Sequence, residues 1–282
     1  MKHQAPRIHL VALFMCSLLL PAAVARAQTD VPPAWTEFVS WYRASAGVSD
    51  PAALFAAYGA KLKADGLGET AIKERLAQVA AEAPKHRLDL AAIHFDKIYA
   101  SSTPPFQVEP SAYLVRAVGG RTPGAALDIA MGQGRNALYL ASQGWQVTGY
   151  DISEGGIAAA RAEAAARKLA INAVRASHED FDFGVDRWDL IVMAYAFTPM
   201  EDAKFLQRVR DSLKPGGLIV VEQFNASPDK PTNKGPANAL FKSFEGLRVV
   251  HYEDTVDRSE WGAAMCRIGR VTAEKDAAPR QR

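Results

Sequence analysis

The segment from Leu127 to Gly134, which reads LDIAMGQG, constrains the fold more than any other part of the chain. An apolar run stands before it, two glycines lie one residue apart within it, and a helical pattern follows it. A strand, a glycine turn and a helix in this order let a ligand lie against bare backbone at a helix N-terminus. The segment therefore predicts a site for a polar or anionic ligand where a strand ends.

After Gly124, short apolar runs alternate with helical patterns, which is typical of a parallel sheet covered by helices on both faces. Residues 214–217, which read KPGG, are expected to end the last of these helices in a turn. The expected strands are 125–130, 146–150, 173–177, 190–194 and 218–224, and the expected helices are 135–142, 155–169 and 202–213.

The end of the chain contains two extended runs, 247–253 and 263–271, which are expected to form an antiparallel pair at the sheet edge. Glu253, Asp254 and Asp257 are expected to belong to a polar turn between them. The predicted fold is an α/β, doubly wound, mostly parallel seven-stranded sheet of Rossmann-like type. An antiparallel C-terminal strand pair and an N-terminal helical extension complete it.

Four segments organise the predicted chain: a signal peptide at 1–27, a helical extension at 28–110, a ligand-binding domain at 111–272 and a polar tail at 273–282. The extension shows helical spacing of apolar residues, and a proline-containing loop at 101–110 ends it.

The first 27 residues have the pattern of a secretory signal, with Lys2 and Arg7 before an apolar run at 8–20 and small residues up to Ala27. We expect cleavage after Ala27, export to the periplasm and no stable membrane association afterwards; an uncleaved anchor is the alternative. Cys266 is then the remaining cysteine, so we expect no intramolecular disulfide.

Charge gives little indication of a macromolecular partner, because 33 Lys and Arg face 31 Asp and Glu with both signs interspersed. No basic run marks a nucleic-acid surface, so we expect a small-molecule partner and no nucleic acid. The histidines at 86, 94, 178 and 251 lack the close spacing of a zinc site, and no metal is expected. The sequence does not indicate an oligomeric state.

A second carboxylate makes the expected ligand a nucleoside. Asp151 ends the second expected strand, 23 residues after Asp128, where a carboxylate can accept hydrogen bonds from ribose hydroxyls. The spacing of Gly132, Gly134 and Ala137 also fits a loose dinucleotide fingerprint, so NAD is an alternative ligand. Asp128 argues against NAD, since its charge repels a pyrophosphate and attracts the ammonium group of a methionine moiety.

These motifs resemble those of class I S-adenosylmethionine-dependent methyltransferases. The stretch from Asp128 to Asp151 looks like the first motifs of that family, and its GQGRN run is similar to the tellurite-resistance and thiopurine methyltransferase type. Residues 188–192 and 213–217 resemble later motifs in the right order, so the resemblance covers about 125–222. It implies S-adenosyl-L-methionine as cofactor and in-line methyl transfer to an unidentified small-molecule acceptor.

The resemblance also implies which residues bind the cofactor. Ala130 stands where the family usually has glycine, which leaves weaker cofactor binding open. Ser177 stands where the family often has an aspartate that contacts the adenine amino group, and Glu179 is the alternative acceptor there. The implied cofactor-binding residues are Asp128, Ala130, Gly132, Gly134, Asn136, Asp151, Ile152, Ser177, His178, Glu179 and Ala194.

The catalytic residues are unknown from the sequence, because a reactive sulfonium makes a strong base optional. Tyr99, Tyr195 and Glu222 are candidates, and each also has an ordinary packing or ion-pairing explanation. Phe95, Asp96 and Tyr99 lie on a helical stretch whose face is expected to close over the cofactor. An exported, non-catalytic module that retains the methyltransferase fold is an alternative function, as is an NAD-dependent oxidoreductase.

Overall fold

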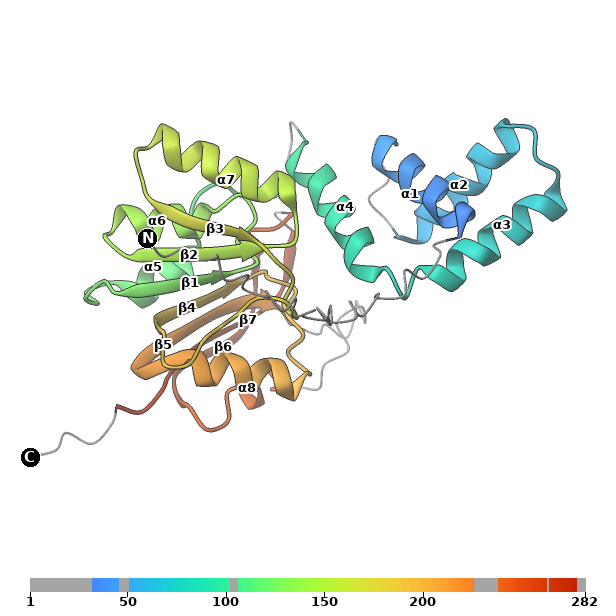
Figure 1. Ribbon diagram of the computed structural model, residues 1–282. Helices are drawn as coiled ribbons and strands as arrows, with labels where there is room; N and C mark the ends of the chain where they lie inside the picture. The colour runs from blue at the N-terminus through green and yellow to red at the C-terminus, as the bar shows by residue number, and fades with distance from the viewer. Residues whose placement is uncertain (1–31, 46–50, 102–105, 226–237, 263, 278–282) are drawn as a thin grey trace, which may run out of the picture.

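The computed structural model describes residues 32–45, 51–101, 106–225, 238–262 and 264–277 (Figure 1). The expected signal peptide lies outside these residues, so export and cleavage after Ala27 stay predictions. Within the described residues, no helix combines the length and apolar character needed to cross a membrane. The half-buried Cys266 is unpaired in the described part of the chain.

A seven-stranded sheet in the order β3-β2-β1-β4-β5-β7-β6 forms the body of the protein (Figure 1). Strands β1 to β5 pair in parallel, whereas β7 pairs antiparallel with both β5 and β6. The predicted fold class is confirmed. The strands are β1 Ala125–Ile129, β2 Gln146–Asp151, β3 Ile171–Arg175, β4 Trp188–Ala194, β5 Leu213–Phe224, β6 Arg248–Arg258 and β7 Met265–Glu274.

Helices cover both faces of this sheet, and each face has its own core. In the central strand β4, Ile191 and Met193 pack on the α8 side, while Leu190 and Val192 pack on the side of α5, α6 and α7. Alternating burial of this kind explains the continuous apolar runs of the sequence. The helices are α5 Ala112–Val118, α6 Arg135–Ser142, α7 Glu154–Ala166, α8 Ala203–Ser212 and the short α9 Ala239–Lys242.

Two expected boundaries differ from the structure. Strand β3 begins at Ile171, two residues earlier than expected, and its partly polar composition hid the start. The expected turn at 214–217 lies inside β5, where the pairing with β4 jumps from Leu213 to Leu218 and Gly216 adopts φ +81°. The sequence KPGG therefore makes an irregularity between two paired segments.

The predicted polar turn at Glu253, Asp254 and Asp257 is wrong, because β6 continues through all three residues to Arg258. Arginines on the neighbouring strand β7 stabilise these carboxylates in the strand. Arg267 contacts Asp254 at 2.6 Å, and Arg270 contacts Asp257 at 2.8 Å. Strand β7 likewise extends to Glu274, into the expected polar tail.

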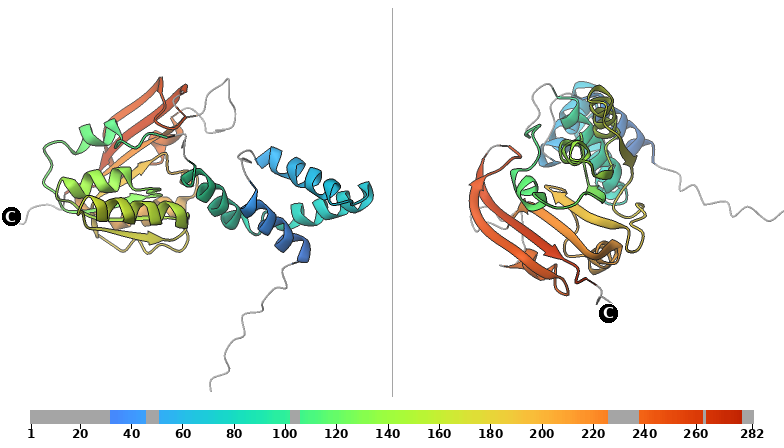
Figure 2. Two further views of the ribbon diagram at one scale, coloured as in Figure 1. Left: turned by 90° about the horizontal axis from the view of Figure 1, so that it is seen from above. Right: turned by 90° about the vertical axis from the view of Figure 1, so that its left-hand side faces the viewer.

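The N-terminal region contains four helices, α1 Pro33–Ala44, α2 Pro51–Ala64, α3 Glu69–Glu82 and α4 Arg87–Tyr99. Helices α1, α2 and α3 project away from the sheet in two views, and α4 links them to it (Figures 1 and 2). They have a separate core around Phe38 and Tyr58, whose rings meet edge to face at 5.1 Å. The expected helical extension is confirmed.

Helix α4 is fastened to the sheet domain by Asp96, whose Oδ1 accepts hydrogen bonds from Ser153 Oγ at 2.6 Å and from the Gly155 amide at 2.9 Å. Both donors lie at the start of α7. The two helices approach closely because Gly155 and Gly156 have no side chains, and a Cβ on Gly156 would lie 3.0 Å from the ring of Tyr99. This contact sets the position of α4 relative to the carboxyl ends of the strands.

A buried ion pair joins β5 to β7 and holds the start of α5. Glu222 is 2% exposed, and its carboxylate accepts hydrogen bonds from Arg270 at 2.7 Å and from Ser111 Oγ at 2.6 Å. Ser111 is the N-cap residue of α5, and its backbone amide donates to Asn136 Oδ1 at 2.9 Å. The charge of Glu222 is therefore used to connect strands and helices.

We expect Glu222→Ala to lower the free energy of unfolding by about 3 kcal/mol, because it leaves the buried Arg270 without its closest partner. Glu163→Ala, which removes an exposed i,i+4 pair with Arg167, should change it by less than about 0.5 kcal/mol. Urea unfolding of both variants measures the difference. A loss below about 1 kcal/mol for Glu222→Ala would show that this pair does not hold the sheet edge.

Candidate functional site

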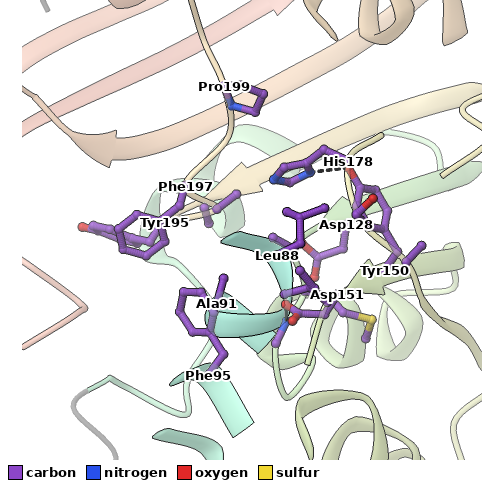
Figure 3. Close-up of a pocket in the computed structure, with 18 of the residues that line it drawn as sticks. Leu88, Ala91, Phe95, Asp128, Tyr150, Asp151, His178, Tyr195, Phe197 and Pro199 are labelled. Atoms are coloured by element: carbon purple, nitrogen blue, oxygen red, sulfur yellow. Dashed lines mark hydrogen bonds between the residues drawn. The ribbon is translucent and has the colours of Figure 1, made fainter. Parts of the chain in front are cut away.

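A cavity of about 520 Å³ opens at the carboxyl ends of β1, β2 and β4. Strand β1 lies between β2 and β4, so the strand order reverses direction beside it. In open parallel sheets, ligands bind in the crevice at this switch point. Figure 3 shows side chains from the sheet edge on one side of the cavity and from α4 on the other.

The glycine turn supplies the floor of the cavity. Ala130 and Gly132 line it, with φ of +53° and +55°, in the left-handed region that disfavours a side chain. Gly134 caps α6 with φ +81° and does not line the cavity. A Cβ on Gly134 would lie 3.0 Å from Ala160 Cβ, so the second glycine serves the turn and the packing of α6 on α7.

Asp128 is the unusual charge of the site. Its side chain is 2% exposed and lines the cavity, and its Oδ2 has no hydrogen-bond partner among the described residues. Burial raises the pKa of Asp128 to about 7, while the charge of Arg135 opposes this shift. Buried polar atoms are almost always satisfied, so this oxygen calls for a donor from a ligand.

Asp151 is held more firmly. Its Oδ2 accepts the amide of Gly132 at 2.8 Å and its Oδ1 accepts the amide of Ser153 at 2.8 Å. Burial raises the pKa of Asp151, and these two backbone bonds act in the opposite direction. Each carboxylate oxygen keeps one lone-pair direction free. Asp151 can therefore accept two further hydrogen bonds, as a pair of ribose hydroxyls requires.

One face of α4 forms the opposite wall, with Leu88, Ala91, Phe95 and Tyr99 at helical spacing (Figure 3). The Tyr99 hydroxyl lies directly over Gly132, where a Cβ would meet it at 2.3 Å. Burial, with the charges of Asp151 and Asp128, raises the pKa of Tyr99 well above its ordinary value. Tyr99 is thus a hydrogen-bond donor and not a base.

The residues after β3 are engaged with one another. Ser177 Oγ donates to Asp180 at 2.7 Å and accepts the Asp180 amide at 3.1 Å, so its hydroxyl stabilises a turn. Glu179 pairs with Arg87 of α4 at 2.6 Å across the cavity mouth. His178 Nδ1 bonds the Tyr150 hydroxyl at 2.9 Å, and burial lowers the pKa of His178 (Figure 3).

An aromatic wall closes the other end of the cavity. Phe95, Phe106, Phe197 and Trp261 all line it, and we call these four residues the aromatic wall. Phe106 and Trp261 lie 4.9 Å apart between ring centroids, and Phe197 lies 5.9 Å from Phe95 and 6.0 Å from Trp261. Tyr195 lies beside Phe197, and burial raises its pKa above the ordinary value, so it too stays protonated.

The structure brings most of the predicted site residues together. Glu222 lies outside the cavity lining because Arg270 and Ser111 occupy its carboxylate, and Gly134 lies outside it as described above. The predicted residues that do line the cavity are Tyr99, Asp128, Ala130, Gly132, Asn136, Asp151, Ile152, Ser177, His178, Glu179, Ala194 and Tyr195.

Sequence reasoning missed several lining residues. Trp261 comes from the turn between β6 and β7, and Phe106 from the loop before α5, so neither carries a local motif. Arg135 stands next to the second glycine, and its proximity to Asp128 was the signal that it faces the ligand. Across the described ranges, no group of three or more His, Cys, Asp or Glu side chains is arranged to hold a metal ion.

Comparisons with known proteins agree with this geometry. Residues 126–217 match the family model described as a methyltransferase domain. Together with the motif series and the strand order, this match places the chain in the class I S-adenosylmethionine-dependent methyltransferase family. The family implies S-adenosylmethionine, rather than NAD, as the cofactor.

One curated relative is a demethylmenaquinone methyltransferase from Clavibacter sepedonicus, with 32% identity over 114 residues. The match covers 39% of this chain and 44% of that protein, so it spans less than half the length of the relative.

Two solved structures share the fold. TehB from Haemophilus influenzae superposes with a TM-score of 0.53 at 20% identity, over 66% of this chain and 67% of that one. A protein solved in work on the conversion of a disulfide bond into a thioacetal group during echinomycin biosynthesis gives 0.54 at 23% identity, over 66% and 93%.

We expect Ala130→Gly to raise the free energy of unfolding by about 1 kcal/mol, because glycine adopts φ +53° without the Cβ clash that alanine makes. Ala137→Gly in α6 is the matched control, and should lower it by about 1 kcal/mol, since a helix interior disfavours glycine. Thermal unfolding compares the two variants. Equal losses for both would contradict strain at Ala130.

Proposed function

We propose that this protein transfers the methyl group of S-adenosylmethionine to a small-molecule acceptor. The observation that carries the proposal is the buried, unpartnered oxygen of Asp128 beside Asp151 at the switch point of the sheet. The methionine moiety has an ammonium group to satisfy the first carboxylate, and the ribose has two hydroxyls for the second. NAD, the alternative ligand, has a pyrophosphate where Asp128 places a negative charge.

The residues of the cavity fit the parts of this cofactor in sequence. Asp128 and the glycine turn would hold the amino-acid end, with the Tyr99 hydroxyl as an additional donor. Asp151 and Ile152 would hold the ribose, and the segment from Ser177 to Glu179 would flank the adenine. The half of the cavity lined by Tyr195 and the aromatic wall then remains for the acceptor.

S-adenosylmethionine, when bound, supplies a methyl group on a positively charged sulfur, which is reactive without an acid. The chain therefore has to hold the acceptor atom in line with that methyl group and exclude water. Helix α4 does the second task, since its apolar face covers the glycine turn. Neither Tyr99 nor Tyr195 is a base near neutral pH, so the acceptor's proton leaves to solvent.

Calorimetry with S-adenosylhomocysteine and with NAD tests the proposal. We expect the first to bind and the second not to bind. Asp151→Ala should weaken binding at least tenfold, because two charge-assisted hydrogen bonds are lost. Asp211→Ala, an exposed aspartate on α8 that contacts Gln207, should bind normally. Binding of NAD alone would support an oxidoreductase, and binding of neither ligand would support a non-catalytic module.

Cofactor binding should depend on pH through Asp128. In the free protein its carboxyl group takes up a proton below about pH 7 because burial raises its pKa. An ammonium group lowers that pKa on binding, so binding releases a proton and strengthens as the pH rises from about 5.5 to 7.5. Asp128→Asn should bind about tenfold more weakly and lose this pH dependence. Proton release that persists in Asp128→Asn would assign the effect to another group.

A further inference from the structure

The cavity is divided into two chemically different halves. Asp128 and Asp151 make one half acidic, while Phe95, Phe197 and Trp261 make the other half aromatic. The rings contact one another at their edges: Phe95 and Trp261 meet at 79° with 6.4 Å between centroids, and Phe197 and Trp261 meet at 81°. They line the space and leave it open, which is the arrangement of a binding surface.

The backbone holds this wall in place under strain. Tyr195 and Phe197, which follow β4, have φ of +53° and +47°, in the left-handed region that bulky side chains rarely adopt. Phe197 keeps 61% of its surface exposed despite this strained position. Strained residues persist where the surrounding structure requires them and cluster at ligand sites. A strained and exposed phenylalanine at the cavity wall therefore indicates contact with a bound molecule.

The opposite side of the wall is also fixed. The Ser259 hydroxyl accepts the Trp261 amide at 2.9 Å and donates to its carbonyl at 2.6 Å, which locks the turn. Glu260 then pairs with Arg135 at 2.7 Å, directly after the glycine turn. Trp261 is thus connected to the loop that would hold the cofactor, so its ring keeps a constant distance from the reacting end of the cavity.

The charges around the cavity disfavour an anionic acceptor. Its two arginines are both paired, Arg87 with Glu179 at 2.6 Å and Arg135 with Glu260 at 2.7 Å. Glu201 adds a further negative charge to the lining near Phe197. An oxyanion entering this half of the cavity would lose its hydration and meet rings and carboxylates.

We infer that the acceptor is a planar, uncharged aromatic molecule that packs against Trp261 and Phe197, with a hydroxyl or thiol directed at the cofactor. This inference rests on the proposed function. The heteroatom loses its proton to solvent, and its lone pair forms the new bond to the methyl carbon. The bond between methyl carbon and sulfur breaks, and its electron pair stays on sulfur. Aromatic rings recognise such a molecule by stacking and edge contacts.

The test uses the whole chain saturated with S-adenosylhomocysteine, and 2-naphthol as a fluorescent planar probe. We expect saturable binding of 2-naphthol, and transfer of labelled methyl to benzenethiol or 2-naphthol but not to tellurite or selenite. Trp261→Ala and Phe197→Ala should each weaken 2-naphthol binding about tenfold while S-adenosylhomocysteine binds within twofold of the unaltered protein. Trp261→Tyr should recover part of the loss.

Phe241→Ala is the matched control, since Phe241 is a 45% exposed aromatic that packs on Tyr252 outside the cavity lining. It should bind both ligands normally. Bound S-adenosylhomocysteine with no 2-naphthol binding, or methyl transfer to tellurite and to neither aromatic probe, overturns the inference and leaves the proposed function intact. Failure of S-adenosylhomocysteine itself to bind overturns the proposed function first, and the inference with it.

Discussion

A carboxylate buried at the edge of a parallel sheet, with one oxygen unpartnered, is the constraint on which the rest of the site depends. Asp128 is unfavourable there in the free protein, as its raised pKa shows. The fold accepts this cost where the backbone of the glycine turn and the firmly bonded Asp151 make a cradle beside it. Positive charge from a ligand removes the penalty, so binding and the stability of the site are coupled.

Helix α4 turns this open sheet edge into an enclosed cavity. Asp96 ties the helix to the first turn of α7, and the glycines at 155 and 156 let it approach closely enough for Tyr99 to lie over Gly132. The N-terminal extension therefore contributes a wall of the site. Solvent exclusion, which methyl transfer needs, comes from a segment outside the matched methyltransferase domain of 126–217.

The sequence predicted what local patterns determine. Strands β1 and β2, helix α6 and the pairing of Asp128 with Asp151 follow from apolar periodicity and a turn that needs glycine. Trp261 and Phe106 could not be found in this way, because long-range packing brings two unrelated loops together. Glu222 illustrates the opposite case, since its place at the end of β5 suggested chemistry while its partner Arg270 lies 48 residues away. Ionic partners across strands leave no local signal.

The crystal structure of the complex with S-adenosylhomocysteine tests the central claim most directly. The account predicts the ammonium nitrogen within hydrogen-bond distance of Asp128 Oδ2 and both ribose hydroxyls on Asp151. It further predicts that the sulfur faces the half of the cavity lined by Phe197 and Trp261. A ligand bound elsewhere, or bound here with its amino group away from Asp128, would contradict the account.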